Sequence, residues 1–166
     1  VTAHLNLGLA FGTGEHPTTA LCLEWLDAHL RSGTQIMDYG CGSGILAIAA
    51  LQLGASYGWA VDIDPQALTA TQANACLNHV QDHLWIGTPD ALPIIQADVV
   101  IANILANTLS NLVALFERCI KPGGHLVLSG ILEPQNDSLC QTYGQQFGPF
   151  TLQQRDEWTL ISAPRR

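Results

Sequence analysis

A glycine-rich turn between an apolar run and an alanine-rich segment is the strongest constraint on how this chain folds. The apolar run that begins at Ile36 is typical of a buried strand. Glycines follow at positions 40, 42 and 44, and the alanine-rich segment after them is typical of a helix that ends near Gly54. Glycines let the backbone approach a ligand closely, and a helix start presents unpaired N–H groups. Together these elements predict a nucleotide pocket.

The spacing of the glycines indicates which nucleotide binds. The dinucleotide fingerprint G-x-G-x-x-G/A, counted from Gly40, places the large residue Ile45 at its last small position, which argues against an NAD-dependent dehydrogenase. The spacing fits D-x-G-x-G-x-G, from Asp38 to Gly44. This pattern resembles the first motif of the Rossmann-like methyltransferases, which bind S-adenosylmethionine. A tight turn without a ligand is the alternative that the glycines alone leave open.

An acidic residue follows the next apolar run. Asp62 comes directly after residues 57–61. A carboxylate at the tip of the second strand, about 20 residues beyond the glycines, is placed to accept hydrogen bonds from ribose hydroxyls. Asp64 precedes Pro65, which suits a first helical position, so Asp64 is predicted to cap the following helix. This leaves Asp62 for the sugar.

Apolar strands and amphipathic helices alternate along most of the chain. Further strands are predicted near residues 83–86, 97–103, 125–129, 150–154 and 158–162. The alternation implies parallel β-α-β units with right-handed crossovers, and the last two strands are too close for a helix between them. We therefore expect an α/β fold with a mostly parallel seven-stranded sheet, helices on both faces and one late antiparallel strand, as in Rossmann-like class I methyltransferases.

Besides the alanine-rich helix, three helices can be predicted in some detail, and a further one only weakly. The first opens at Pro17, and its apolar face is predicted at Ala20, Leu23, Leu26 and Leu30. The second runs from about residue 64 to 78. The third has its apolar face at Leu105, Leu109, Leu112, Val113 and Phe116, and residues 121–124 are predicted to end it. A weaker helix is predicted near residues 135–146. We expect one domain over 1–166, with a glycine-rich loop and first helix at 1–34 and the core at 35–166.

Three polar or glycine positions fall at predicted strand ends. Gly40, Asp62 and Asn103 end the first, second and fourth strands. In an open α/β sheet the ligand lies beyond the carboxyl ends of the strands, so these three residues are expected to converge on one site. For Asn103 the alternative is a cap on the helix that follows.

Composition narrows the classes of partner. The net charge of −8 argues against direct nucleic-acid binding and favours a basic partner such as a lysine-rich protein. The five cysteines form no C-x-x-C pair and their odd number excludes a complete disulfide framework, which suits reduced thiols. No signal peptide or run of about 18 apolar residues occurs, so we expect a cytoplasmic protein without a membrane span. His79 and His83 have helical spacing but no supporting ligands, and no metal site is expected.

Four motifs in order carry a resemblance to one family. They are A-F-G-T-G-x-H-P-T-T at 10–19, D-x-G-C-G-S-G-I-L-A-I-A-A at 38–50, D-I-D-P at 62–65 and A-N-I-L at 102–105. From about residue 8 to residue 158 the chain resembles the bacterial methyltransferases of the large-subunit ribosomal protein L11. That family carries a small N-terminal domain that grips the ribosomal protein. This sequence has no room for it, so we expect an isolated catalytic domain.

The resemblance implies an enzyme, a protein N-methyltransferase. Its cofactor would be S-adenosylmethionine, with S-adenosylhomocysteine as product, and its acceptors would be lysine side chains and/or the N-terminal amine of the basic ribosomal protein. The implied cofactor-binding residues are Phe11, Thr13, His16, Thr19, Gly40, Gly42, Gly44, Asp62, Ile63 and Asn103. Two alternatives stay open: a related methyltransferase with another protein or small-molecule acceptor, and a cofactor-binding domain that is inactive without its N-terminal domain.

The chemistry asks little of the protein beyond alignment. Methyl transfer from a sulfonium is an in-line displacement on an activated donor, so the protein mainly positions an unprotonated amine. A lysine amine, with a reference pKa of about 10.4, must first lose its proton, and desolvation lowers that pKa. Asn103 and His16 are the catalytic candidates: Asn103 to orient the amine, and His16 to relay the proton or to serve only as a hydrogen-bonding loop residue. Cys41 is expected to be a packing residue beside the cofactor.

Overall fold

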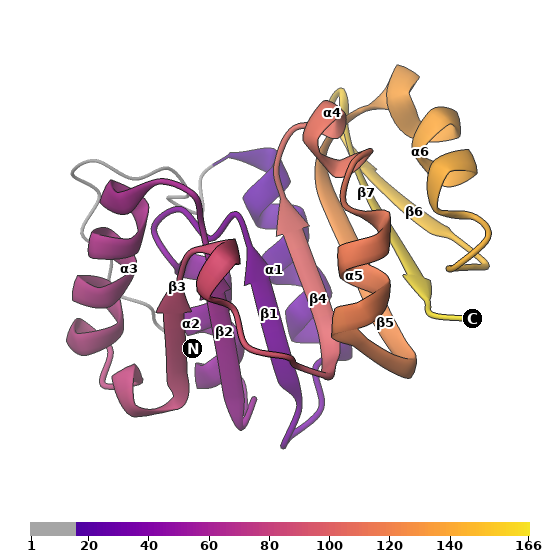
Figure 1. Ribbon diagram of the computed structural model, residues 1–166. Coiled ribbons are helices and arrows are strands. Elements are labelled where there is room, and N and C mark those ends of the chain that lie inside the picture. Colours follow the sequence, from indigo (N-terminus) through magenta and orange to yellow (C-terminus); the bar gives the residue numbers. More distant parts are fainter. Residues whose placement is uncertain (1–15) are drawn as a thin grey trace.

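The computed structural model describes residues 16–166, which form a seven-stranded sheet flanked by helices (Figure 1). The strands are β1 (Gln35–Tyr39), β2 (Tyr57–Val61), β3 (Leu84–Gly87), β4 (Ala97–Asn103), β5 (Ile120–Leu132), β6 (Thr151–Arg155) and β7 (Trp158–Pro164). The α-helices are α1 (Pro17–His29), α2 (Ile45–Gln52), α3 (Pro65–Leu77), α4 (Ala106–Leu109), α5 (Val113–Cys119) and α6 (Asn136–Tyr143). Short 3₁₀ turns are η1 (Gln81–His83), η2 (Pro89–Ala91) and η3 (Glu133–Gln135). None of these helices is long and apolar enough to span a bilayer.

The strand order is β3-β2-β1-β4-β5-β7-β6. Pairing is parallel from β3 through β5, and β7 runs antiparallel to both of its neighbours. The expected mostly parallel sheet with one late antiparallel strand is confirmed. The strand order reverses direction between β1 and β4, and such a switch point is where open α/β sheets bind ligands.

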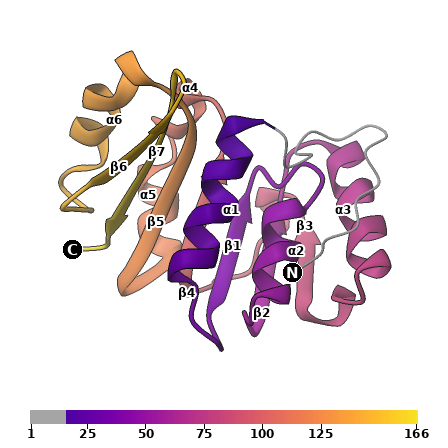
Figure 2. The same cartoon turned by 180° about the vertical axis from the view of Figure 1, so that it is seen from behind.

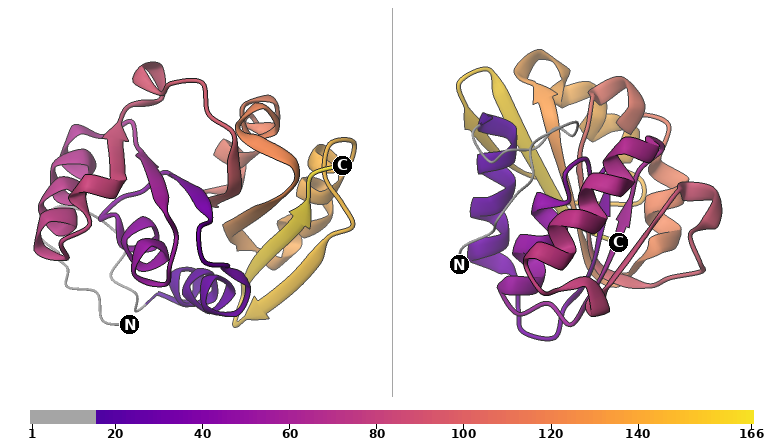
Figure 3. Two further views of the ribbon diagram at one scale, coloured as in Figure 1. Left: turned by 90° about the horizontal axis from the view of Figure 1, so that it is seen from below. Right: turned by 90° about the vertical axis from the view of Figure 1, so that its left-hand side faces the viewer.

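Helices cover both faces of the sheet. The helices α1, α2 and α3 lie on the face seen in Figure 2, whereas α4, α5 and α6 lie on the other. Seen from below, α1 and α2 stand on one side of the sheet and α5 on the other (Figure 3, left). Neighbouring strand residues point to opposite faces, so Ile36 packs in the core under α1 and α2 and Met37 packs in the core under α5 and α6.

The buried face of α1 differs from the predicted one. Its buried residues are Thr18, Thr19, Leu21, Cys22, Trp25 and Leu26. Of the predicted face only Leu26 is fully buried, whereas Ala20, Leu23 and Leu30 are half-buried. The leucines of this helix lie on two sides of it, so their spacing alone does not decide which side is buried. The helix packs on β5 and β7, and the ring centroid of Trp25 lies 6.3 Å from that of His125 on β5. The buried face therefore follows from tertiary packing rather than from leucine spacing.

The predicted long helix after β4 is divided into α4 and α5, so this prediction is wrong. Ser110 and Asn111 lie in the break, where their side chains hydrogen-bond to the carbonyls of Ala106 (3.0 Å) and Asn107 (3.3 Å). Such local bonds compete with a regular helix. Residues 121–124 also do not end the helix as predicted, because α5 already ends at Cys119 and the Pro-Gly-Gly segment forms the irregular start of β5.

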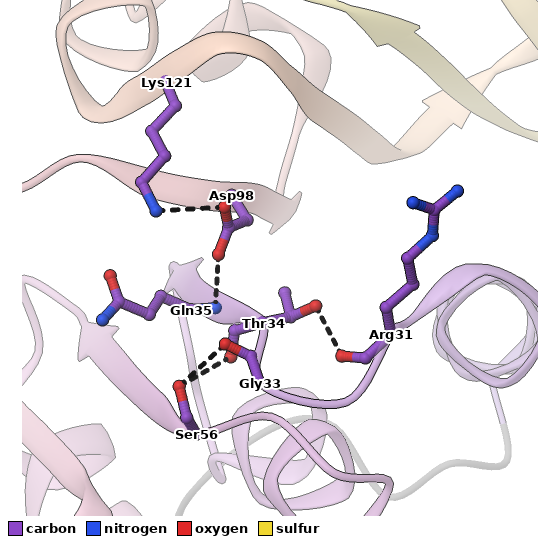
Figure 4. A network of polar contacts seen from close by, with 7 residues as sticks. All are labelled: Arg31, Gly33, Thr34, Gln35, Ser56, Asp98 and Lys121. Carbon is purple, nitrogen blue, oxygen red and sulfur yellow. Dashed lines mark hydrogen bonds and ion pairs between the residues drawn. The ribbon is translucent and has the colours of Figure 1, made fainter.

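The amino ends of the central strands are tied together by one carboxylate (Figure 4). Asp98 Oδ2 accepts the N–H of Gln35 at 2.8 Å, and Asp98 Oδ1 accepts from Lys121 Nζ at 3.1 Å. Beside them, the Ser56 hydroxyl donates to the carbonyl of Gly33 at 2.9 Å. These contacts join β1, β4 and β5 at the edge opposite to their carboxyl ends, which are thereby set side by side.

Candidate functional site

A pocket of about 310 Å³ opens at the carboxyl ends of β1 and β4, at the switch point of the sheet. The start of α1 contributes His16, Thr18 and Thr19. The end of β1, its loop and the start of α2 contribute Asp38, Gly40, Cys41, Gly42, Ile45 and Leu46. The end of β4 and the later strands contribute Asn103, Ile104, Leu105, Gly130 and Trp158. The pocket thus brings together five of the predicted site residues: His16, Thr19, Gly40, Gly42 and Asn103.

The glycine loop has a backbone that only glycine adopts readily. Gly40, Gly42 and Gly44 have φ values of +77°, +55° and +86°, in the left-handed region where a Cβ is unfavourable. Packing adds a second reason. A Cβ on Gly40 would overlap the side chain of Ile104, and one on Gly44 would lie 2.8 Å from Thr71 Cγ2. Gly44 itself faces away from the pocket lining, toward α3.

Asp38 lies at the end of β1 and is 1% exposed. Its Oδ2 accepts the N–H of Ala47 in the first turn of α2 at 3.2 Å. Burial raises the pKa of the Asp38 carboxyl to about 7; the hydrogen bond from Ala47 opposes this shift and the nearby Asp62 charge adds to it. The pocket wall therefore contains an acid that titrates near neutral pH, which the sequence pattern marked only as part of a motif.

The structure places Asp62 directly behind the glycine loop. Its Oδ2 accepts the N–H of Gly42 at 2.9 Å, and its Oδ1 accepts the N–H of Asp64 at 3.0 Å. Asp64 caps α3 by accepting from Gln66 N–H at 2.9 Å, so this prediction is confirmed. Asp62 does not line the pocket but stands next to it through Gly42. Each carboxylate oxygen has a second lone pair for a further donor. Ile63 beside it is 79% exposed.

The start of α1 forms a second wall. His16 caps the helix, with its Nδ1 accepting the N–H of Thr18 at 3.2 Å and lying 2.9 Å from the Thr18 hydroxyl. The His16 ring packs edge to face on Trp158, with 5.1 Å between ring centroids. His16 thus has the hydrogen-bonding role that the sequence left open. Phe11 and Thr13 lie outside the described residues.

Asn103 joins this wall to the end of β4. Its Nδ2 donates to Thr19 Oγ1 at 3.3 Å. The N-cap position of the helix that follows is Leu105, with no side-chain capping bond, so Asn103 is not its N-cap and the alternative role is ruled out. The other end of the amide lies near Gly130, where an added Cβ would come within 3.2 Å of Asn103 Oδ1.

Some lining residues had no signal in the motifs. Trp158 reaches the pocket because β7 pairs with β5, a contact between distant segments. Gly130 is an isolated glycine inside a strand, which is a sign of a bulge or a close backbone approach. Cys41 is buried, its Sγ lies 3.4 Å from Thr71 Oγ1, and burial raises the pKa of its thiol, as expected for a packing residue. Within residues 16–166 no three His, Cys, Asp or Glu side chains are grouped to hold a metal ion.

Comparison with known proteins shows the family to which the chain belongs. The sequence model of the ribosomal protein L11 methyltransferase (PrmA) family matches residues 1–166. The chain belongs to this family. It is 50% identical over 161 residues to the ribosomal protein L11 methyltransferase of Hahella chejuensis, covering 97% of this chain and 55% of that protein. It is 52% identical over 163 residues to that of Haemophilus influenzae, covering 98% of this chain and 55% of that protein. The chain thus spans about half the length of these curated relatives.

Solved structures agree with this family. The crystal structure of the ribosomal protein L11 methylase from Lactobacillus delbrueckii subsp. bulgaricus superposes with a TM-score of 0.87 and 32% identity, covering 98% of this chain and 84% of that one. A 16S rRNA N2 G1207 methyltransferase of T. Thermophilus, solved with AdoMet and guanosine, superposes with a TM-score of 0.73 and 20% identity over 95% of this chain and 45% of that one. The second likeness shows the fold alone.

Proposed function

We propose that this chain binds S-adenosylmethionine in the pocket at the β1–β4 switch point and transfers its methyl group to amines of ribosomal protein L11. The acceptors would be lysine side chains and/or the N-terminal amine. Membership of the L11 methyltransferase family supports the proposal. The observation that carries it is the hydrogen bond from Asn103 to Thr19, which holds a polar amide in the wall of the same pocket that the glycine loop lines.

The residues present fit the cofactor. S-adenosylmethionine carries a sulfonium, an α-ammonium group and a ribose diol. The carboxylate of Asp62 matches the diol, and the glycine loop leaves room for the nucleoside. When bound, the cofactor supplies a methyl group that is already activated for displacement. The residues proposed to hold it are His16, Thr19, Gly40, Gly42, Gly44, Asp62, Ile63 and Asn103, with Phe11 and Thr13 from the preceding loop.

Asn103 is proposed to orient the acceptor. Because its Nδ2 donates to Thr19, the plane of the amide is held, and Oδ1 is the atom that can accept an N–H from an amine. Such alignment of two reactants can supply about 7–11 kcal/mol of a barrier. The role needs no proton transfer by Asn103 itself.

The proton of the acceptor amine is proposed to leave past His16. The apolar side chains of Ile104, Leu105 and Trp158 at the pocket would remove water from the amine and so favour its neutral form. Nδ1 of His16 accepts the Thr18 N–H, so Nε2 carries the hydrogen of the neutral imidazole, and the amine proton would be taken at Nδ1 in exchange for this hydrogen bond. The exposed position of His16 provides a path for the proton to solvent.

Charge supports a basic protein partner. The chain has a net charge of −8, and such a field attracts cationic partners and raises their association rate. This agrees with a basic ribosomal protein as the acceptor. The dependence of the methylation rate on ionic strength would report this attraction.

Two measurements test the function in sequence. Titration calorimetry with S-adenosylhomocysteine should show saturable binding, whereas NAD should not bind. Transfer of radiolabel from S-adenosylmethionine to purified L11 should then occur and should fall strongly when the amines of L11 are blocked by acetylation. Binding of NAD instead, or label transfer that ignores the blocked amines, would overturn the proposal.

A second candidate follows from the length of the relatives. Because this chain covers 55% of the curated relatives, it is also consistent with a cofactor-binding unit that holds S-adenosylmethionine but needs further residues to engage L11. Binding of S-adenosylhomocysteine without label transfer to L11 would favour this candidate. Transfer to a different protein or a small molecule would favour a related methyltransferase with another acceptor.

A further inference from the structure

The helix α3 lies against the glycine loop and contacts it through two buried polar side chains. Thr71 and Asn74 are one turn apart on α3, on the same face, and both are 0% exposed. Thr71 Oγ1 donates to the carbonyl oxygen of Gly42 at 2.9 Å, and Asn74 Nδ2 donates to the carbonyl oxygen of Ser43 at 2.9 Å. Neither side chain lines the pocket, so both act on the loop from behind.

These bonds fix the orientation of two successive peptide groups. A peptide group is planar and trans, so its C=O and N–H point in opposite directions. Holding the Gly42 carbonyl toward α3 therefore turns the Ser43 N–H away from α3. The other side of Gly42 is held as well, because its own N–H donates to Asp62 at 2.9 Å. The loop is thus clamped on both sides of a residue whose φ is +55°.

Thr71 contacts more of the loop than one carbonyl. Its hydroxyl lies 3.4 Å from Cys41 Sγ. Its methyl group lies where a Cβ on Gly44 would come within 2.8 Å. One side chain therefore touches or confines three loop positions, while it remains outside the pocket.

We propose that Thr71 and Asn74 are positioning residues that hold the glycine loop in its ligand-binding shape. This inference rests on the proposed function, because the ligand concerned is S-adenosylmethionine. Glycine loses more conformational freedom on ordering than any other residue, so a loop with three glycines needs anchors outside itself. If an anchor is lost, the binding of the ligand has to order the loop, and affinity falls.

Three substitutions separate the hydroxyl from the shape of the side chain. Thr71→Val keeps the shape and removes the hydroxyl, whereas Thr71→Ser keeps the hydroxyl. Thr69→Val is the matched control, because Thr69 Oγ1 donates to Pro65 within α3 itself, at 3.0 Å and on the exposed side. For each purified variant we would measure the Kd for S-adenosylhomocysteine by calorimetry and the KM and kcat for methyl transfer.

The expected pattern is selective. Thr71→Val should raise the Kd about tenfold, as for the loss of one hydrogen bond, and the KM for S-adenosylmethionine should rise in parallel. The kcat should change by less than about twofold, because the side chain does not touch the reacting groups. Thr71→Ser and Thr69→Val should bind as the unchanged protein does. If Thr71 served packing alone, Thr71→Val would lower thermal stability without raising the Kd and the KM while kcat stays nearly constant.

The failures of this inference and of the proposed function can be told apart. If the unchanged protein does not bind S-adenosylhomocysteine, the proposed function fails. If it binds and Thr71→Val binds equally well, or if Thr71→Ser loses as much affinity as Thr71→Val, the positioning role fails. Should Thr71→Val unfold at the assay temperature, thermal unfolding with and without saturating S-adenosylhomocysteine decides: a smaller ligand-induced rise in Tm supports the inference, and an equal rise overturns it.

Discussion

Asn103 Nδ2 donates a hydrogen bond to Thr19 Oγ1 over 3.3 Å, although the two residues are 84 positions apart in the chain. The bond joins the end of β4 to the start of α1, and its two residues belong to different motifs of the sequence. Both residues line the pocket, so the bond links the parts of its wall that come from the α1 start and the β4 end.

Replacing Asn103 by alanine should lower turnover far more than stability. The amide is proposed to align the amine, and misalignment of reactants can cost about 100-fold in rate, so we expect kcat to fall by about this factor. The Tm should stay close to that of the unchanged protein, because Asn103 does not cap a helix. Steady-state label transfer and calorimetric melting measure the two quantities. Asn111→Ala, which removes an exposed amide on the same connection, should change neither; an unchanged rate for Asn103→Ala would refute the assignment.

Two neighbouring aspartates should have opposite phenotypes. Asp62→Asn should raise the Kd for S-adenosylhomocysteine by about 10-fold or more, since it weakens the acceptor of the Gly42 N–H, which is also proposed to accept from the ribose. Asp64→Ala removes the cap of α3 and should cost about 1 kcal/mol in the free energy of unfolding, with little effect on the Kd. Calorimetric titration and urea unfolding of both variants provide the comparison. The same loss of affinity in both would contradict separate roles.

The sequence predicted most of what lies at strand tips and less of what depends on packing between distant segments. The glycine spacing, Asp62 and the Asp64 cap are local patterns, because turn conformation and capping are decided within a few residues. Asn103 could be placed because the carboxyl ends of parallel strands meet at one edge. Trp158 could not, because it reaches the pocket only through the antiparallel pairing of β7 with β5.

Two wrong predictions have different physical origins, one in tertiary packing and one in local hydrogen bonds. The spacing of leucines in α1 allows more than one buried face, and the observed face depends on which side chains fit against β5 and β7. The single helix predicted after β4 ignored the local hydrogen bonds of Ser110 and Asn111. Periodicity describes which faces are apolar, and tertiary contacts decide which of them is buried.

The free energy of unfolding should depend on pH through the titration of Asp38. Its carboxyl has a pKa of about 7 in the folded state because it is buried, against about 3.9 in an unfolded chain. Between these values the folded state binds more protons than the unfolded state, so this group makes stability fall as pH rises. The contribution is fully present below about pH 4 and is lost as pH rises to about 7.

Asp38→Asn removes this proton while leaving an oxygen that can accept from Ala47. The difference in unfolding free energy, unchanged protein minus variant, should therefore fall by up to about 1.4 kcal/mol per pH unit between pH 5 and 7 and then level off. Urea unfolding at several pH values gives the two curves. Parallel curves over this range would contradict a protonated Asp38 in the folded protein.

A side chain at position 130 should be unfavourable because it would crowd the amide of Asn103 in the pocket. The φ of Gly130 is +82°, and a Cβ there would lie 2.5 Å from the Ile104 carbonyl oxygen and 3.2 Å from Asn103 Oδ1. Gly130→Ala should therefore both destabilise the protein by about 1–3 kcal/mol and lower kcat by displacing the Asn103 amide. Gly123→Ala is the control, since Gly123 has a φ of +79° and a Cβ added to it would meet no atom within 4 Å. Gly123→Ala therefore has the same unfavourable backbone conformation as Gly130→Ala but no clash with a neighbouring atom.

The two glycine variants are compared by urea unfolding and by label transfer. Gly123→Ala should lose only the smaller backbone part of the stability, about 1 kcal/mol, and should keep the kcat of the unchanged protein. Because both residues lie on β5, the excess loss in Gly130→Ala reports the contact with the β4 end. Equal kcat values for the two variants would show that the position of the Asn103 amide does not depend on the space that Gly130 leaves for it.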